Sequence, residues 1–192
     1  MTSKAPQGTV LVTGGAGFIG SHTVVELIAS GYEVVIVDNL VNSKREAVRR
    51  IEGIVGRQVP FYEIDACDRA ALGKVFDAHP ISAAIHFAAL KAVGESIAKP
   101  IEYYRNNMDS LLALLDTMRA RNVKRVVFSS SATVYGVPGR SPIDESFPLS
   151  ATNPYGQTKI MAEQVLRDVE RADANWRIAT LRYFNPVGAH ES

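Results

Sequence analysis

The residue types best suited to chemistry are Tyr155 and Lys159, which stand four positions apart and follow Asn153 and Pro154. Asparagine followed by proline is typical of a helix N-cap and first helical residue, so a helix is expected to begin here with both side chains on one face. A phenol titrates at about pH 10 and is a poor base at neutral pH. A neighbouring ammonium and the helix N-terminus favour the phenolate, which makes Tyr155 a candidate proton acceptor from a hydroxyl group. The alternative interpretation is a Tyr–Lys pair on a helix surface, which this spacing also produces.

Three consecutive serines, Ser129–Ser131, end an apolar run and could bind a reacting oxygen. Serine-rich strand ends are also common turns, and residue type alone does not separate the three. A hydrolase triad is not predicted, because no Gly-x-Ser-x-Gly elbow is present. The four histidines lack metal-ligand spacing, so no metal site is expected at His22, His79, His86 or His190. His86, inside an apolar run, is expected to be a packed strand residue.

Near the start of the chain, three glycines spaced three apart predict a phosphate-binding turn: Gly14, Gly17 and Gly20. They follow a β-branched run and precede a helical pattern, so the helix N-terminus would face a pyrophosphate. Asp38 stands 21 residues after Gly17, at the end of the next apolar run, where an acidic side chain meets an adenosine ribose hydroxyl. Spaced glycines alone also occur in ordinary turns, but this context predicts a dinucleotide site.

The elements that must position these residues alternate along the whole chain. Expected strands are Thr9–Thr13, Glu33–Val37, Val59–Ile64, Ala83–Phe87, Arg125–Ser129 and Arg177–Arg182. Expected helices are Phe18–Ser30, Ser43–Val55, Arg69–Ala78, Ile101–Arg121 and Pro154–Arg171. The strands are continuous apolar runs, which indicates helices on both faces of an α/β, doubly wound, Rossmann-like parallel sheet of six strands. Two stretches are expected to be irregular loops beside the ligand, Lys91–Pro100 and Gly136–Asn153.

Composition limits the class of protein. The chain has 192 residues, 46% of them hydrophobic, and its 21 Lys and Arg nearly balance 20 Asp and Glu. The charges are scattered, so neither nucleic acid nor a membrane surface is an expected partner. Cys67 is the single cysteine, Met1–Gly8 is polar, and the apolar run that follows is too short for a signal peptide or membrane span. A cytoplasmic protein is therefore expected.

Together these motifs resemble the extended short-chain dehydrogenase/reductases and, within them, the UDP-glucose (UDP-galactose) 4-epimerases. The resemblance runs from about Thr9 to the last residue. The glycine and Tyr-x-x-x-Lys motifs are those of the superfamily. The blocks that are specific to the epimerases are Lys91–Ser96, Ser129–Gly136 and Tyr183–His190.

The resemblance implies NAD as cofactor. Asp38 supports NAD over NADP, because its charge repels a 2′-phosphate. The residues implied around the cofactor are Gly14, Gly17, Phe18, Ile19, Gly20, Asp38, Asn39, Asp65, Ala66, Phe87, Ala88, Lys91, Asn106, Ser129, Tyr155, Lys159 and Tyr183.

The resemblance also implies a reaction. Ser131 would be the catalytic serine, Tyr155 the base and Lys159 its electrostatic partner and a ribose ligand. The UDP-sugar substrate would contact Lys91, Ser131, Tyr155 and Asn185. Family members oxidise the sugar C4 hydroxyl to a ketone by hydride transfer to NAD⁺ and return the hydride to the opposite face. A related dehydratase is a lesser alternative, because Ala132 and Thr133 stand where dehydratases carry an Asp–Glu acid/base pair.

Family members continue into a smaller domain that grips the UDP-sugar, whereas this chain stops at Ser192. Residues 1–192 are thus expected to be an NAD-binding Rossmann-like domain without the substrate domain. A binding module that holds NAD without turnover remains a second hypothesis. The choice between a hexose and an N-acetylhexosamine stays open.

Assembly is a further expectation. Helices 101–121 and 154–171 carry apolar residues beyond one core stripe, which favours a second packing partner. The resemblance implies a homodimer through these helices, although core packing alone could explain the pattern.

Overall fold

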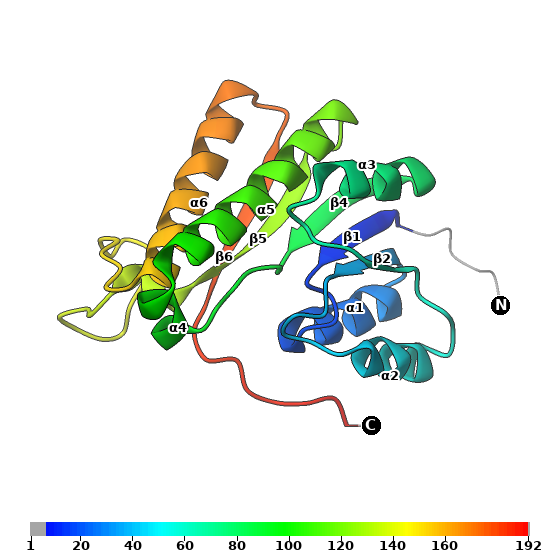
Figure 1. The fold of residues 1–192 in the computed structure, drawn as a ribbon, viewed down its shortest axis with the longest axis horizontal. Helices are drawn as coiled ribbons and strands as arrows, with labels where there is room; N and C mark the ends of the chain where they lie inside the picture. The colour runs from blue at the N-terminus through cyan, green and yellow to red at the C-terminus, as the bar shows by residue number, and fades with distance from the viewer. Residues whose placement is uncertain (1–6, 192) are drawn as a thin grey trace.

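The computed structural model describes residues 7–191 and contains one six-stranded sheet with helices on both faces (Figure 1). Most of the polar segment Met1–Gly8 lies outside the described residues. Within residues 7–191, no helix is long and apolar enough to cross a membrane. In chain order the elements are β1 Thr9–Thr13, α1 Phe18–Ala29, β2 Glu33–Asp38, α2 Arg45–Val55, β3 Phe61–Glu63, α3 Arg69–Ala78, β4 Ile81–His86, α4 Val93–Ala98, α5 Pro100–Ala120, β5 Arg125–Ser131, the short 3₁₀ helix η1 Ala132–Tyr135, α6 Pro154–Ala172 and β6 Arg177–Tyr183.

All the strands are parallel, and their order is β3-β2-β1-β4-β5-β6. The chain moves outward from β1 to β3 and then returns to the other side of β1 with β4. Connections that leave β1 and β4 therefore diverge to opposite faces of the sheet, which opens a crevice at the carboxyl ends of these strands. The expected six-stranded, doubly wound sheet is confirmed.

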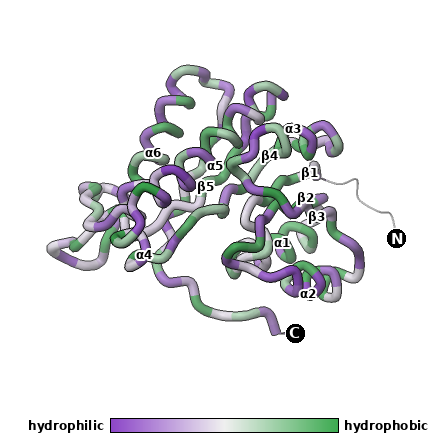
Figure 2. The backbone as a smooth tube through the Cα atoms, in the orientation of Figure 1, coloured by the Kyte–Doolittle hydropathy of each residue, from purple (hydrophilic) through white to green (hydrophobic). Residues whose placement is uncertain are grey.

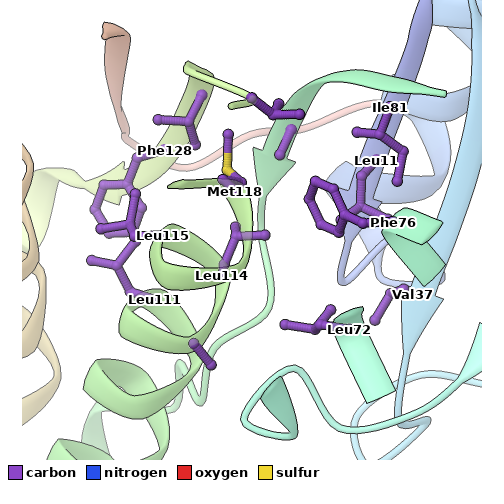
Figure 3. Close-up of a cluster of buried hydrophobic side chains, with 14 of the residues drawn as sticks. Leu11, Val37, Leu72, Phe76, Ile81, Leu111, Leu114, Leu115, Met118 and Phe128 are labelled. Atoms are coloured by element: carbon purple, nitrogen blue, oxygen red, sulfur yellow. The ribbon is translucent and has the colours of Figure 1, made fainter. Parts of the chain in front are cut away.

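Each face of the sheet has its own hydrophobic core. On one face Leu11 of β1 packs with residues of α3, α5 and α6, including Leu72, Leu114 and Leu166. Figure 3 shows the side chains of Leu72 and Phe76 from α3 and of Leu111, Leu114 and Leu115 from α5 in this one layer, together with Leu11. On the other face Val12, the next residue of β1, packs against residues of α1 and α2. Alternate residues of a strand point to opposite faces, so a continuous apolar run fills both layers.

The helices that cover the sheet carry both buried apolar residues and exposed polar residues. Figure 2 shows hydrophobic and hydrophilic residues alternating along α2, α5 and α6. In α2, Val48 and Ile51 are buried while the arginines between them are exposed. This three-residue spacing places the apolar side chains on the face toward the sheet.

Two expectations about local structure were wrong. The strand expected over Val59–Ile64 covers only Phe61–Glu63, because Pro60 has no N–H for the ladder and β3 is an edge strand. The stretch Lys91–Pro100, expected to be irregular, contains helix α4. Tyr103 of α5 fixes that helix, since its hydroxyl accepts from the N–H of Ala92 at 3.0 Å and donates to Glu95 at 2.9 Å.

Candidate active site

A cleft of about 610 Å³ opens at the carboxyl ends of the strands. This volume lies within the range usual for cofactor and substrate pockets. Every residue given a cofactor, catalytic or substrate role from the sequence lines the cleft. They come from the β1–α1 turn, the segments after β2, β3 and β4, helix α5, the end of β5, helix α6, and β6 with the segment after it: Gly14, Gly17, Phe18, Ile19, Gly20, Asp38, Asn39, Asp65, Ala66, Phe87, Ala88, Lys91, Asn106, Ser129, Ser131, Tyr155, Lys159, Tyr183 and Asn185.

The three glycines of the β1–α1 turn are required for different reasons. Gly14 has a φ of +72°, and a Cβ there would lie 2.7 Å from the backbone nitrogen of Ala88. At Gly20 a Cβ would lie 2.2 Å from the carbonyl oxygen of Gly14, so a side chain would push α1 off the turn. At Gly17 it would meet only that same oxygen, at 3.3 Å. Protein packing therefore demands glycine at Gly14 and Gly20. A Cβ on Gly17 would make one tight contact only, and Gly17 lines the cleft beside the N-terminus of α1, where a phosphate group would bind.

The carboxylate of Asp38 is held in place before any ligand arrives. Its Oδ2 accepts from the N–H of Ala16 at 3.0 Å, and its Oδ1 accepts from the N–H of Leu40 at 2.9 Å and from Ser43 Oγ at 2.7 Å. Asp38 is buried, yet it lines the cleft. Sequence reasoning did not assign Ser43 to the site, because a single serine in a turn belongs to no motif that indicates a ligand.

Tyr155 and Lys159 lie together at the start of α6. Asn153 caps this helix, since its Oδ1 accepts from the N–H of Gly156 at 2.8 Å, and Pro154 is the first helical residue, as expected. The Nζ of Lys159 lies 5.8 Å from the centre of the Tyr155 ring and donates to the carbonyl oxygen of Ser129 at 2.8 Å. Only 4% of Lys159 is exposed, so the interpretation as a surface pair was wrong.

Burial sets the titration of both side chains. It lowers the pKa of Lys159 to about 8, although the carboxylate of Glu163 partly opposes this shift. It raises the pKa of the Tyr155 phenol, and a hydrogen bond with the Ser131 side chain partly offsets the rise. Burial thus opposes the phenolate-favouring effect expected of the ammonium and the helix N-terminus, and in the protein itself the pKa of the phenol is raised.

The structure separates the three serines, which the sequence did not. Ser131 interacts with Tyr155 and accepts from Thr133 Oγ1 at 3.0 Å. Ser130 Oγ donates to Glu163 at 2.6 Å, and Ser129 offers its carbonyl oxygen to Lys159. Only Ser131 thus has its hydroxyl beside the phenol. Thr133, which also lines the cleft, was missed because its contact depends on the 3₁₀ turn of η1.

Asn107 of α5 is a third residue that the sequence did not reveal. Its side chain is buried, accepts from the N–H of Leu90 at 2.8 Å, and donates to the carbonyl oxygen of Leu90 at 3.0 Å and to Thr158 Oγ1 at 3.1 Å. One amide thereby fixes the segment after β4 to both α5 and α6. That segment carries Ala88 and Lys91 into the cleft.

His86 is a packed strand residue, as expected. Its Nδ1 lies 2.7 Å from Thr13 Oγ1, and its ring stacks on Phe128 with a centroid distance of 6.1 Å. Burial, followed by the charge of Lys159, lowers its pKa to about 3. Within residues 7–191, no group of three or more His, Cys, Asp and Glu side chains could hold a metal ion.

Comparison with known proteins identifies close relatives. The sequence profile of the "NAD dependent epimerase/dehydratase family" matches residues 10–192. The chain is 60% identical to "UDP-glucose 4-epimerase" of Bacillus subtilis over 95% of its own length and 54% of that protein. It is 53% identical to "UDP-glucose 4-epimerase" of Mus musculus over 95% of the chain and 55% of that protein. A crystal structure of UDP-glucose 4-epimerase from Bifidobacterium longum in complex with NAD⁺ and UDP has a TM-score of 0.93 and 57% identity, over 95% of this chain and 55% of that one. The chain thus spans about half the length of these relatives.

We expect the His86 imidazole to stay neutral through the pH range in which an exposed histidine takes up a proton, because burial holds its pKa at about 3. The unfolded chain protonates this group at about pH 6.5, so the stability that His86 contributes is present above that pH and is lost as the pH falls toward 3. Heteronuclear NMR of histidine-labelled protein would measure the titration, with His86→Gln to assign the signal. A midpoint near that of free histidine contradicts the expectation.

Proposed function

We propose, because this chain belongs to the NAD dependent epimerase/dehydratase family, that it is the cofactor-binding part of a UDP-hexose 4-epimerase. The reaction is the interconversion of UDP-glucose and UDP-galactose through a 4-keto intermediate. The retained cofactor is NAD. The names of relatives that are 60% and 53% identical support this substrate class.

One observation carries the proposal. The cleft that holds the glycine turn and Asp38 also holds the phenol of Tyr155, with Ser131 beside it and the buried Lys159 next to its ring. A base, a hydroxyl donor and a cation therefore face the space that a dinucleotide would share with a second ligand. This arrangement suits proton removal from an alcohol that is oxidised in the same cleft.

Each of these residues has a proposed role. Tyr155 takes the proton of the sugar C4 hydroxyl and later returns it, while Ser131 hydrogen-bonds the same oxygen. Bound NAD⁺ supplies the hydride acceptor and, through its positive nicotinamide, a charge that favours the phenolate. That charge is needed because burial raises the pKa of Tyr155 in the protein itself. Lys159 adds a second positive charge and a donor for the ribose.

The sugar is proposed to be gripped by a further domain, because the relatives named UDP-glucose 4-epimerase are about twice as long as this chain. Residues 1–192 are the proposed NAD-binding domain. A dehydratase is a weaker candidate, because Ala132 and Thr133 supply no acid/base pair after β5.

We expect the chain to bind NAD⁺ more tightly than NADP⁺, and Asp38→Ala to weaken NAD⁺ binding by about tenfold or more, since hydrogen bonds to a charged group are lost. Gly17→Ala should also impair binding, and it should lower the unfolding midpoint in urea less than Gly20→Ala does, because its Cβ lines the phosphate site and meets one backbone oxygen at 3.3 Å. Titration calorimetry measures the affinities for the two cofactors, and urea unfolding measures the midpoints. Gly20→Ala serves as the contrast, since its Cβ clashes with the turn and should destabilise the fold. Equal affinity of the parental chain for the two cofactors would refute the assignment.

In a chain extended to the length of its relatives, Tyr155→Phe should lower the rate of UDP-glucose and UDP-galactose interconversion by about 10²–10⁴ while NAD⁺ binding is kept. The ring still packs, and only the proton-accepting oxygen is lost. Ser131→Ala should cost less, because it removes one hydrogen bond. Tyr32→Phe, which removes a phenol outside the cleft, is the control. A Tyr155→Phe rate near the parental one shows that the base is another group.

We also propose a homodimer through α5 and α6. Ile101 and Leu112, three turns apart on α5, and Met161 of α6 are apolar yet 66%, 45% and 38% exposed. These apolar side chains lie outside the core, and a second copy would cover them. Light scattering should give a dimer for the parent and a monomer for Leu112→Glu. Val137→Glu, at an exposed loop site, should leave the dimer intact. A parent that is monomeric at micromolar concentration argues against the dimer.

A further inference from the structure

Glu163 is a buried carboxylate that lies outside the cleft. It follows Lys159 by one turn of α6, and only 2% of its surface is exposed. Neither Glu163 nor its partner Arg182 is among the residues that line the cleft. A buried carboxylate is costly unless it is paired and hydrogen-bonded, so its position calls for a role that does not involve ligand contact.

The carboxylate joins three elements. Its Oε1 accepts from Ser130 Oγ of β5 at 2.6 Å and from Arg182 Nε of β6 at 3.0 Å. Its Oε2 accepts from Arg182 Nη2 at 2.7 Å and, more weakly, from Arg167 Nη1 at 3.5 Å. The paired contact with Arg182 fixes both the direction and the distance of α6 relative to the last two strands.

Ser130 transmits this restraint to the site because of its neighbours. Ser129 before it accepts the Lys159 ammonium at its carbonyl oxygen, and Ser131 after it contacts Tyr155. Alternate residues of a strand point to opposite faces, so holding the Ser130 side chain also fixes the directions of the Ser129 and Ser131 side chains; all three serines line the cleft.

Arg182 extends the same network. Its Nη1 donates to the hydroxyl of Tyr135 at 2.8 Å, which fixes the end of η1 and so the turn that carries Thr133. The next residue on β6, Tyr183, lines the cleft. Glu163 and Arg182 therefore fix, from outside the cleft, the two elements that carry Thr133 and Tyr183 into it.

We propose that Glu163 is a positioning residue, whose carboxylate binds Ser130 and Arg182 and so keeps Tyr155 and Lys159 of α6 aligned with the end of β5. This inference rests on the proposed function, since Tyr155 and Lys159 act on substrate only there. Glu163 itself touches neither substrate nor cofactor.

The charge of Glu163 gives this role a measurable signature. The charged and titratable groups around it are Lys159 and Arg167 on α6 and Arg182 on β6, and Arg182 in turn contacts Tyr135 of η1. Lys159 also faces the neutral His86 of β4 and the phenol of Tyr155. Although burial raises the pKa of Glu163, hydrogen bonds from Arg182 and Ser130 lower it more, so the carboxylate is ionised and supports the protonated form of Lys159.

The first test compares Glu163→Gln with Glu170→Gln in the 192-residue chain. Glu170 is exposed on the same helix, so both variants remove one negative charge from α6. NMR of lysine-labelled protein measures the pKa of Lys159, with Lys159→Met to assign the signal. We expect Glu163→Gln to lower this pKa by about one unit or more below the parental value of about 8, and Glu170→Gln to leave it in place.

The second test separates position from charge. Arg182→Lys keeps every charge and removes the paired contact with Glu163. In the chain extended to the length of its relatives, we expect this variant to lower kcat for UDP-glucose by about tenfold, because small misplacements of catalytic groups are costly. The KM for UDP-glucose and the pKa of Lys159 should change little. If Glu163→Gln does not fold, the kcat of Arg182→Lys alone tests the proposal.

The outcomes discriminate between roles. A purely structural role predicts lower urea midpoints with parental kcat and parental Lys159 pKa in the folded molecules, and that result overturns the proposal. If the parental extended protein does not epimerise UDP-glucose, the proposed function fails. The pKa of Lys159 in Glu163→Gln still decides the role of Glu163 in that case.

Discussion

The site depends on how closely the β1–α1 turn packs against the end of β4. A Cβ on Gly14 would lie 2.7 Å from the backbone of Ala88, and one on Gly20 would overlap the carbonyl of Gly14. This approach brings the start of α1, the carboxyl end of β1 and the segment after β4 to one point. Asp38 then reaches Ala16 in the same turn, which joins β2 to the arrangement. A methyl group on Gly14 or Gly20 would force these segments apart and would change the shape of the cleft around the β1–α1 turn.

The fold and much of the site could be predicted from the sequence, because the relevant signals are local. Apolar runs define the strands, and the glycine spacing and the position of Asp38 are fixed along the chain. Glu163 could not be found in this way, since a glutamate on an amphipathic helix ordinarily faces solvent. Helix α4 was missed because its stability comes from Tyr103, which lies on another element. The net titration of Tyr155 was also out of reach, because burial is a property of the packed molecule.

Several buried polar groups lie around Tyr155, some in the cleft and some behind it. Lys159, Glu163, His86 and Asn107 are all nearly inaccessible to solvent. Within residues 7–191, no buried side-chain nitrogen or oxygen lacks a hydrogen-bond partner. Such a network rigidifies a region when it is complete and destabilises it when one member is lost. The proposed catalytic residues therefore lie where the loss of one polar partner is costly, because their neighbours are buried and depend on one another for hydrogen bonds.

The strand order also determines how the chain reaches its native state. β1 is central, and one of its edges pairs with β2 through Thr9 and Glu33, which are close in the sequence. Its other edge pairs with β4, where Thr13 meets His86 after 73 intervening steps along the chain. Contacts between distant segments form slowly, because loop closure must precede them. As the chain is synthesised from its N-terminus, the β-branched edge of β1 stays open until β4 emerges, and in that interval the nascent molecule is most exposed to pairing with another chain.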